Sequence, residues 1–373
     1  MFKDLFKNYI YPIAVFSAGM IGVGFMSLPY IAMKSGIWVV FGYFLAIAAL
    51  IIVINLIFSD ISLKTPDFKR FPGFADYYLG RWGKFLALII SIFGGLTTLL
   101  VYLVVGGEFL TGALQPIFSG NVLTYTFIYF LVASIFVYLG IRVIAKVEFF
   151  VLILLFLSIF FIFIKGFFQI KISNFISAPP LSLSNLFLPY SPILFALWGA
   201  GLIPQVEEML AKEKKLVKKV VVISTLIGAV FYFLFTILIL GITGTQTTDT
   251  ALLGLKNFLG DGVMIISLFA GFSATFIAFM ASALLVKETL IYDLDIKKWQ
   301  ASVITCVTPM VFLLMGFKSF IPLLSFSGGV LLGIDGVLIL MMYKKTGGKN
   351  IIIYPLAFVF LFGVIYEIIY FIK

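Results

Sequence analysis

Two hydrophobic segments of this chain are interrupted at their centres by pairs of glycines, and each contains a proline a few residues later. The first segment, residues 9–33, is interrupted at 22–24 (Gly-Val-Gly). The second, residues 188–209, is interrupted at 199–201 (Gly-Ala-Gly). Glycine-interrupted spans at matching places in two halves of a chain are typical of secondary transporters with a substrate site near the middle of the membrane.

Unwound backbone at these breaks could bind a zwitterion without any charged side chain. The inner half of the first segment ends near Ile21 and leaves carbonyl groups free, whereas the outer half begins near Val23 with free N–H groups and the positive end of the helix dipole. The second segment runs the other way and presents the same two kinds of group. N–H groups attract a carboxylate and carbonyls attract an ammonium, so the pair of breaks predicts a site for an α-amino acid.

Glycines in membrane helices also serve close packing between helices. For one isolated glycine pair we would favour that packing role. Two breaks at matching positions, each followed by a proline, favour a binding site instead.

The composition requires helices that span a membrane. Of the 373 residues 62% are hydrophobic and 11% are charged, against about 25% charged residues in ordinary soluble domains. Apolar runs long enough to cross a bilayer recur along the whole chain, which predicts one all-α polytopic membrane domain over residues 1–373. We place about eleven spans at 9–33, 37–58, 82–114, 121–140, 143–165, 188–209, 216–241, 262–287, 299–317, 320–342 and 351–372.

The basic residues indicate the orientation of the chain. Of the 26 lysines and arginines, 20 fall on one side when the N-terminus is placed in the cytoplasm. By the positive-inside rule this predicts a multi-pass protein of the cytoplasmic (inner) membrane, with a cytoplasmic N-terminus and, after an odd number of spans, an outside C-terminus. The net charge of +10 therefore reflects the orientation of the chain in the membrane. We expect the lipid bilayer, and not nucleic acid, as the partner.

Histidine is absent from the sequence and there is one cysteine, Cys306, inside a predicted span. Without histidine the chain lacks the commonest metal ligand and the usual base for a serine nucleophile. We therefore expect neither an enzyme nor a metal or cofactor site, apart from Na+ or H+ as a coupling ion.

Six segments resemble the amino acid/polyamine/organocation superfamily and, within it, the amino acid/auxin permease branch. They are GVGFMSLPYIAMKSG at 22–36, DYYLGRWGK at 76–84, VGGEFL at 105–110, IRVIAKVEF at 141–149, FALWGAGLIPQVEEM at 195–209 and KETLIYDL at 287–294. The resemblance implies a five-plus-five inverted repeat with helices 1 and 6 broken at the midplane, alternating access, and cotransport of amino acids. The repeats would cover about 9–165 and 188–342, followed by an extra helix at about 351–372.

Carried over residue by residue, the resemblance places the substrate backbone site on the two breaks. Trp198 would wall a pocket for a bulky neutral side chain, and Thr98 and Tyr102 in the middle of the third span are expected to close over the substrate. The substrate-binding candidates are Ile21, Gly22, Val23, Gly24, Thr98, Tyr102, Phe195, Trp198, Gly199, Ala200 and Gly201.

The coupling ion stays open between sodium and the proton. Where sodium-coupled relatives have an asparagine before the first break, this chain has Gly19, and where some proton-coupled relatives have a lysine deep in the fifth span, the nearest is Lys146 at the inner edge. Sodium would need carbonyls of the first span and hydroxyls of the eighth, whereas a proton would need an acid within a span. The ion-coupling candidates are Ser17, Met20, Glu108, Ser273, Thr275 and Asp335.

These observations predict a secondary active transporter for a neutral, apolar or aromatic, amino acid. Charged side chains are absent beside either break, which argues against charged substrates. The alternative is an amino-acid receptor on the same fold, similar to a spore germinant-receptor subunit, which binds without transport. Glu148, Glu207, Glu208 and Glu288 end helices near basic loops, and we interpret them as gate or structural ion pairs.

Overall fold

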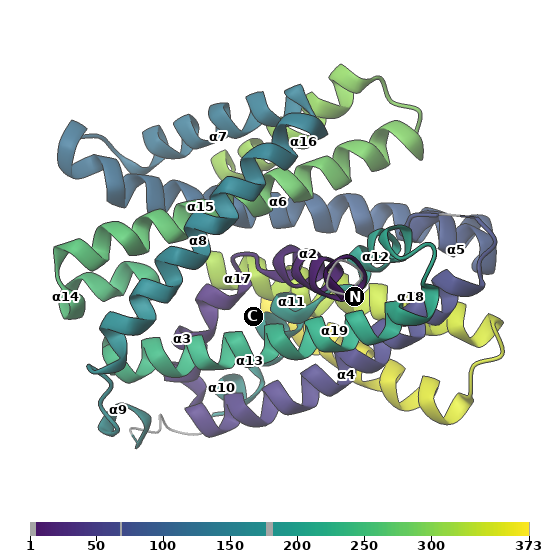
Figure 1. Ribbon diagram of the computed structural model, residues 1–373, viewed down its shortest axis with the longest axis horizontal. Coiled ribbons are helices and arrows are strands. Elements are labelled where there is room, and N and C mark those ends of the chain that lie inside the picture. Colours follow the sequence, from purple (N-terminus) through teal and green to yellow (C-terminus); the bar gives the residue numbers. More distant parts are fainter. Residues whose placement is uncertain (1–4, 68, 177–181, 373) are drawn as a thin grey trace.

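The computed structural model describes residues 5–67, 69–176 and 182–372, and in these residues the chain is nearly all helical and has no strand (Figure 1). Eight helices of this part are long and apolar enough to cross a membrane, so the chain is a multi-pass membrane protein. The long helices are α4 (Ile37–Lys64), α6 (Arg81–Phe118), α7 (Val122–Leu139), α8 (Ile141–Phe167), α13 (Val217–Thr243), α15 (Asp261–Tyr292) and α19 (Asn350–Ile372). The shorter ones used below are α2 (Tyr11–Met20), α3 (Gly24–Ser35), α5 (Phe71–Leu79), α10 (Leu183–Phe187), α11 (Tyr190–Leu197), α12 (Ile203–Met209), α16 (Lys298–Leu314), α17 (Phe320–Ser325) and α18 (Leu332–Lys345).

Two boundaries differ from the sequence-based prediction. The predicted second span ends at residue 58, but α4 continues to Lys64, because its last turns remain buried and Ser62 bonds to Glu207 of α12. The tenth span is divided into α17, a π-helical turn η6 (Phe326–Leu331) and α18. The short helix α5 lies in the connection between α4 and α6.

Glycines with positive φ allow some consecutive helices to follow one another almost directly. Gly36 (φ 88°) lies between α3 and α4, and Gly80 (φ 76°) lies between α5 and α6. Residues other than glycine adopt such angles only with strain. These glycines therefore reverse the chain without a long loop.

Equivalent helices of the two predicted repeats pack against each other. α4 packs on α13, α6 on α15, α3 on α11, and α7 on α16. Four of the five predicted pairs of spans are therefore in contact.

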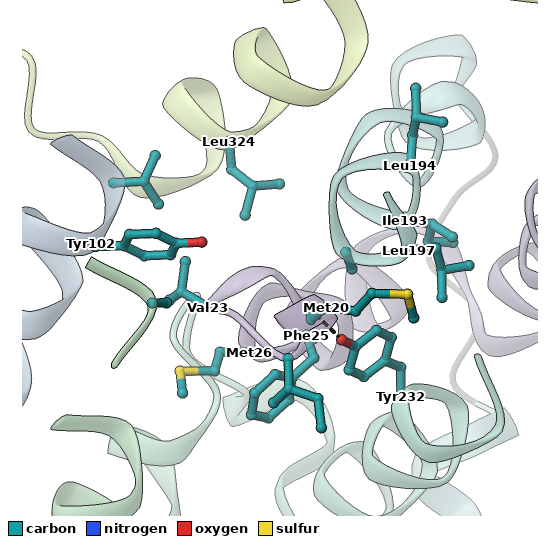
Figure 2. Close-up of a cluster of buried hydrophobic side chains, with 14 of the residues drawn as sticks. Met20, Val23, Phe25, Met26, Tyr102, Ile193, Leu194, Leu197, Tyr232 and Leu324 are labelled. Carbon is teal, nitrogen blue, oxygen red and sulfur yellow. Dashed lines mark hydrogen bonds between the residues drawn. The ribbon is translucent and has the colours of Figure 1, made fainter. Parts of the chain in front are cut away.

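The broken spans lie between two groups of helices. One group contains α4 and α13, and the other contains α6, α7, α8, α15 and α16 (Figure 1). Small residues let the helices approach: a Cβ on Gly228 of α13 would lie 2.6 Å from Cε of Met20. Phe25 of α3 stacks on Tyr232 with ring centroids 5.8 Å apart (Figure 2). Packing of this kind supplies the attraction that the hydrophobic effect cannot provide between helices in lipid.

Candidate substrate-binding site

The structure interrupts the first predicted span at its glycine pair. α2 ends at Met20, residues 21–23 are not helical, and α3 begins at Gly24. The Met20 carbonyl accepts one hydrogen bond from the N–H of Gly22 at 2.9 Å and another from the Tyr232 hydroxyl of α13 at 2.8 Å (Figure 2). The first N–H groups of a helix lack partners within it, so the start of α3 places backbone donors at this break.

The second predicted span is also interrupted at its glycines. α11 ends at Leu197, and Trp198 adopts an extended backbone (φ −67°, ψ 118°). A single 3-10 turn, Ala200–Leu202, leads into α12, which has Pro204 in its first turn. Proline is tolerated there because its missing N–H would have had no partner in the helix.

The two interrupted spans cross at their breaks. A Cβ on Gly199 would lie 2.7 Å from the Phe16 ring and 3.1 Å from the Met20 sulfur. In the reverse direction, a Cβ on Gly24 would lie 2.9 Å from the Phe195 ring. The glycines of each break therefore touch the helix that precedes the other break, and larger residues would separate the spans.

A cavity of about 460 Å³ reaches the second break, and we call it the central cavity. Trp198, Ala200 and Gly201 form part of its wall. Gly201 is exposed, and a Cβ there would meet nothing within 4 Å. Ligand pockets commonly measure about 300–1,000 Å³, so this space suits a small molecule.

Polar groups of α6 and η6 face the same cavity. Thr98 and Ser327 line it, and their hydroxyl oxygens are 3.3 Å apart. Ser282 of α15 also lines it and interacts with the hydroxyl of Tyr102. A Cβ on Gly22 would lie 2.8 Å from that hydroxyl. Tyr102 thus connects the cavity wall to the first break.

Only part of the predicted substrate site lines this cavity. Thr98, Trp198, Ala200 and Gly201 do so, together with Asp335 from the ion-coupling candidates. The lining residues of the central cavity do not include Ile21, Gly22, Val23, Gly24, Tyr102, Phe195 or Gly199. Val23 is fully buried, and Figure 2 shows it beside Tyr102 and Leu324. Ile21 and Gly24 are buried as well and Gly22 is partly exposed, so the first break does not form part of the central cavity in this structure.

The sequence profile of the tryptophan/tyrosine permease family matches residues 7–354. The chain belongs to the tryptophan/tyrosine permease family. The permease is accordingly a secondary transporter and not an enzyme. No curated protein sequence matches it.

Two solved structures share the fold of the permease at low sequence identity. One is MhsT in complex with L-phenylalanine, with 12% identity and a TM-score of 0.61, covering 96% of this chain and 97% of MhsT. The other is Mhp1, a nucleobase-cation-symport-1 family transporter in a closed conformation with bromovinylhydantoin bound. It has 13% identity and a TM-score of 0.66, covering 88% of this chain and 76% of that one.

The sodium-ligand candidates of the permease have different neighbours. The Met20 carbonyl is engaged by Tyr232 of α13, whereas the Thr275 hydroxyl donates to the Gly271 carbonyl (3.0 Å) and the Phe272 carbonyl of its own helix, α15. Ser17 and Ser273 are buried, and their hydroxyls have no hydrogen-bond partner among the described residues. These contacts do not bring the four residues into one cluster.

The two acidic candidates lie in different surroundings. Glu108 of α6 is half-buried and near enough to Asp249 for the two carboxyls to repel each other. Asp335 of α18 faces the central cavity with one buried carboxyl oxygen that lacks a partner among the described residues. Of the two, Asp335 has direct access to a polar space, as a proton carrier requires.

Ion pairs are present at two of the predicted acids. Arg70 donates to Glu288 at 2.7 Å, with its guanidinium 4.7 Å from the centre of the Tyr292 ring, and both members of this pair line the central cavity. Glu207 pairs with Lys214 at 2.8 Å. Glu208 lines the cavity, and the side chains of Lys146 and Glu148 lie outside the described residues.

Sequence reasoning missed three residues that the structure brings to attention. Ser327 and Ser282 line the central cavity, and Glu367 is buried in α19. Ser327 is followed by a glycine pair within an apolar span, and Glu367 is an acid within another. Either signal was visible in the sequence, since an ionisable residue in a span indicates function.

Proposed function

We propose that this permease moves a neutral, apolar or aromatic, amino acid across the cytoplasmic membrane by alternating access, with the substrate held between the two helix breaks. The observation that carries the proposal is the central cavity, whose lining includes Trp198, Ala200 and Gly201 of the second break. Backbone groups there suit the charged ends of an amino acid, and the indole suits its side chain.

The distribution of charge supports a neutral side chain. The charged residues that line the cavity include the Arg70–Glu288 pair and Asp335, and none of them adjoins Trp198, Ala200 or Gly201 in the sequence. MhsT, which shares the fold, has L-phenylalanine bound in its structure, and this also supports a substrate with a neutral side chain.

The positive-inside rule supports a cytoplasmic N-terminus. The central cavity then faces the cytoplasm, because it extends to Arg70 and Phe71 at the α4–α5 connection, and the structure corresponds to an inward-facing state. We further propose that the chain is one transporter domain of two inverted repeats and that it falls in the amino acid/auxin permease branch.

Coupling to protons is favoured over coupling to sodium. Gly19 stands where an asparagine would serve sodium, and the candidate ligands Ser17 and Thr275 have separate neighbours. A desolvated cation needs several well-placed oxygens to offset its dehydration. Glu108 and Asp335 are instead acids within predicted spans, and either could carry a proton.

Uptake into proteoliposomes tests this function. Labelled phenylalanine, tyrosine, tryptophan and leucine are compared with lysine and glutamate, with pH and sodium gradients imposed separately. Accumulation of the neutral set under a pH gradient supports the proposal. Saturable binding without counterflow would instead identify the receptor alternative.

A further inference from the structure

A carboxyl group that the substrate site does not use is buried where α11, η6 and α19 meet. Glu367 of α19 is 2% exposed. The hydroxyl of Ser191 of α11 donates to its Oε1 at 2.5 Å, and its Oε2 is buried with no hydrogen-bond partner among the described residues. An ionised carboxylate with a free buried oxygen is costly, so this position suits a carboxyl that holds a proton.

Cations do not offset a charge at this place. Within the described residues no lysine or arginine forms an ion pair with Glu367. The titratable groups near it are phenols: Tyr190 of α11 and Tyr366 of α19 itself, with Tyr43 of α4 beside both. On α18, the acid Asp335 faces the central cavity and Lys344 bonds to Tyr354 at the other end of α19. Release of a proton would leave an unbalanced charge in the helix junction.

The π-helical turn η6 fits against this carboxyl only because two of its residues are glycines. A Cβ on Gly329 would collide with Cγ of Glu367 and with Oγ of Ser191, and a Cβ on Gly328 would collide with the Ser191 carbonyl. The residue before them, Ser327, lines the central cavity. Single π-turns within helices occur frequently at functional sites. One turn of chain therefore touches both the carboxyl and the cavity.

A second pocket lies on the other side of the junction. It measures about 630 Å³ and is lined by Lys34, Asp249 and Lys318, so we call it the lysine pocket. Tyr370, one helical turn beyond Glu367, and Ser325, the residue before η6, also line it. Glu367 thus lies between two spaces, with η6 next to both.

We propose that Glu367 is a further proton-binding site of this permease, besides the acids Glu108 and Asp335, and that its protonation sets the position of η6 against α11. The neutral carboxyl fits the closed junction. The carboxylate is stable only when η6 or α11 moves and admits water from the lysine pocket or the central cavity. Because α11 continues into the break at Trp198, that movement reaches the substrate site. The inference rests on the proposed proton-driven transport of an amino acid.

Purified permease in liposomes with a trapped pH indicator tests the proposal, with L-phenylalanine as the probe. Wild type should take up protons together with the probe. Glu367→Gln keeps the size and an oxygen that accepts from Ser191, but it cannot release a proton. It should lose substrate-driven proton uptake and lower accumulation by about tenfold, within the usual range of coupling between sites. Exchange of labelled for unlabelled probe should continue, because exchange needs no net proton movement.

Two further variants keep the test decisive. Asp295→Asn removes an exposed acid at a position with φ 53°, which asparagine tolerates, and it should behave like wild type. Glu367→Asp retains an acid but shortens it by one methylene, so proton uptake should persist with a changed pH midpoint. Proton uptake equal to wild type in Glu367→Gln overturns the proposal, and so does an unchanged midpoint in Glu367→Asp if the glutamine variant does not fold.

Different results would reject the Glu367 proposal and the transport function on which it rests. Wild type that exchanges the probe and accumulates it on a sodium gradient alone rejects Glu367 as the coupling site and retains amino-acid transport. Wild type that neither binds nor exchanges any amino acid of the panel rejects the transport function itself.

Discussion

The hydroxyl of Tyr232 donates a hydrogen bond to the carbonyl of Met20, the last residue of α2, over 2.8 Å. Both residues are buried, at 0% and 4% exposure. In hydrocarbon a free carbonyl at a helix break would be costly, and this bond satisfies it from the neighbouring helix α13. The first break is therefore held in place by α13, a helix of the second predicted repeat.

Tyr232→Phe should weaken both the fold and the site. The Met20 carbonyl keeps its bond from Gly22, so the loss of stability should be about 1 kcal/mol, the usual net value of one hydrogen bond. Thermal unfolding and phenylalanine binding are the measurements. Tyr125→Phe is the matched control, because the Tyr125 hydroxyl donates to the Ser119 carbonyl at 3.1 Å, away from the breaks. Equal binding in both variants would show that the Tyr232 bond is only structural.

Leucine at either break should abolish binding. Gly201→Leu places its side chain in the open central cavity, where it takes the space of the substrate, and Gly22→Leu collides with the Tyr102 hydroxyl. We expect binding weaker by more than about tenfold, which corresponds to about 1.4 kcal/mol. Gly42→Leu, on the exposed face of α4 with nothing within 4 Å, is the control for membrane insertion and folding. Normal affinity in both variants would mean that these glycines only pack helices.

The basic connections at 59–84 and 212–219 should face the cytoplasm. The exposed residues Lys212 and Lys318 are replaced by cysteine one at a time, in a background with Cys306 replaced by alanine. Each variant is then labelled in intact cells with a reagent that cannot cross the membrane. Position 318 should react and position 212 should not, because the two lie on opposite sides of the predicted membrane. The reverse pattern would overturn the topology and the inward-facing assignment of the cavity.

Asp293, which follows α15, should make the free energy of unfolding of the protein depend on pH. Burial raises the pKa of this carboxyl above its usual 3.8, although Arg70 and Lys84 act in the opposite direction. The folded state then favours the protonated form, so this contribution is present at low pH and is lost as the pH rises through the raised pKa. Asp293→Asn should therefore be more stable than wild type near pH 7, and the two should converge near pH 4. Thermal unfolding at both pH values measures this, and a variant less stable than wild type at neutral pH would show that the charged form is the one the fold needs.

Uptake at fixed membrane potential should follow the pH gradient and be indifferent to sodium. Glu108→Gln should lower it by about tenfold, within the usual range of coupling between sites. Glu108 lies near Asp249, which lines the lysine pocket, so it can receive protons from that side. Uptake that depends on sodium, ignores pH and survives Glu108→Gln would reject both parts of this prediction.

The sequence by itself determined the class of the protein and the places where its helices break. Apolar runs and sparse charge require membrane helices, because lipid leaves no other way to satisfy the backbone. Glycine pairs at 22–24 and 199–201 fall where the structure interrupts α2–α3 and α11–α12. Both are local properties of the chain, which is why they can be read without knowing what lies next to them.

Only the tertiary structure decided which residues share a space. The central cavity joins the second break to Ser327, whereas Gly22 and Val23 of the first break do not line it and Gly22 lies next to the Tyr102 hydroxyl. Which face of a long helix such as α6 points inward depends on contacts with α7 and α15, which periodicity cannot supply when nearly every residue is apolar. The bond between Ser191 and Glu367 joins positions separated by 176 residues, and they come together because α11 and α19 both pack against η6.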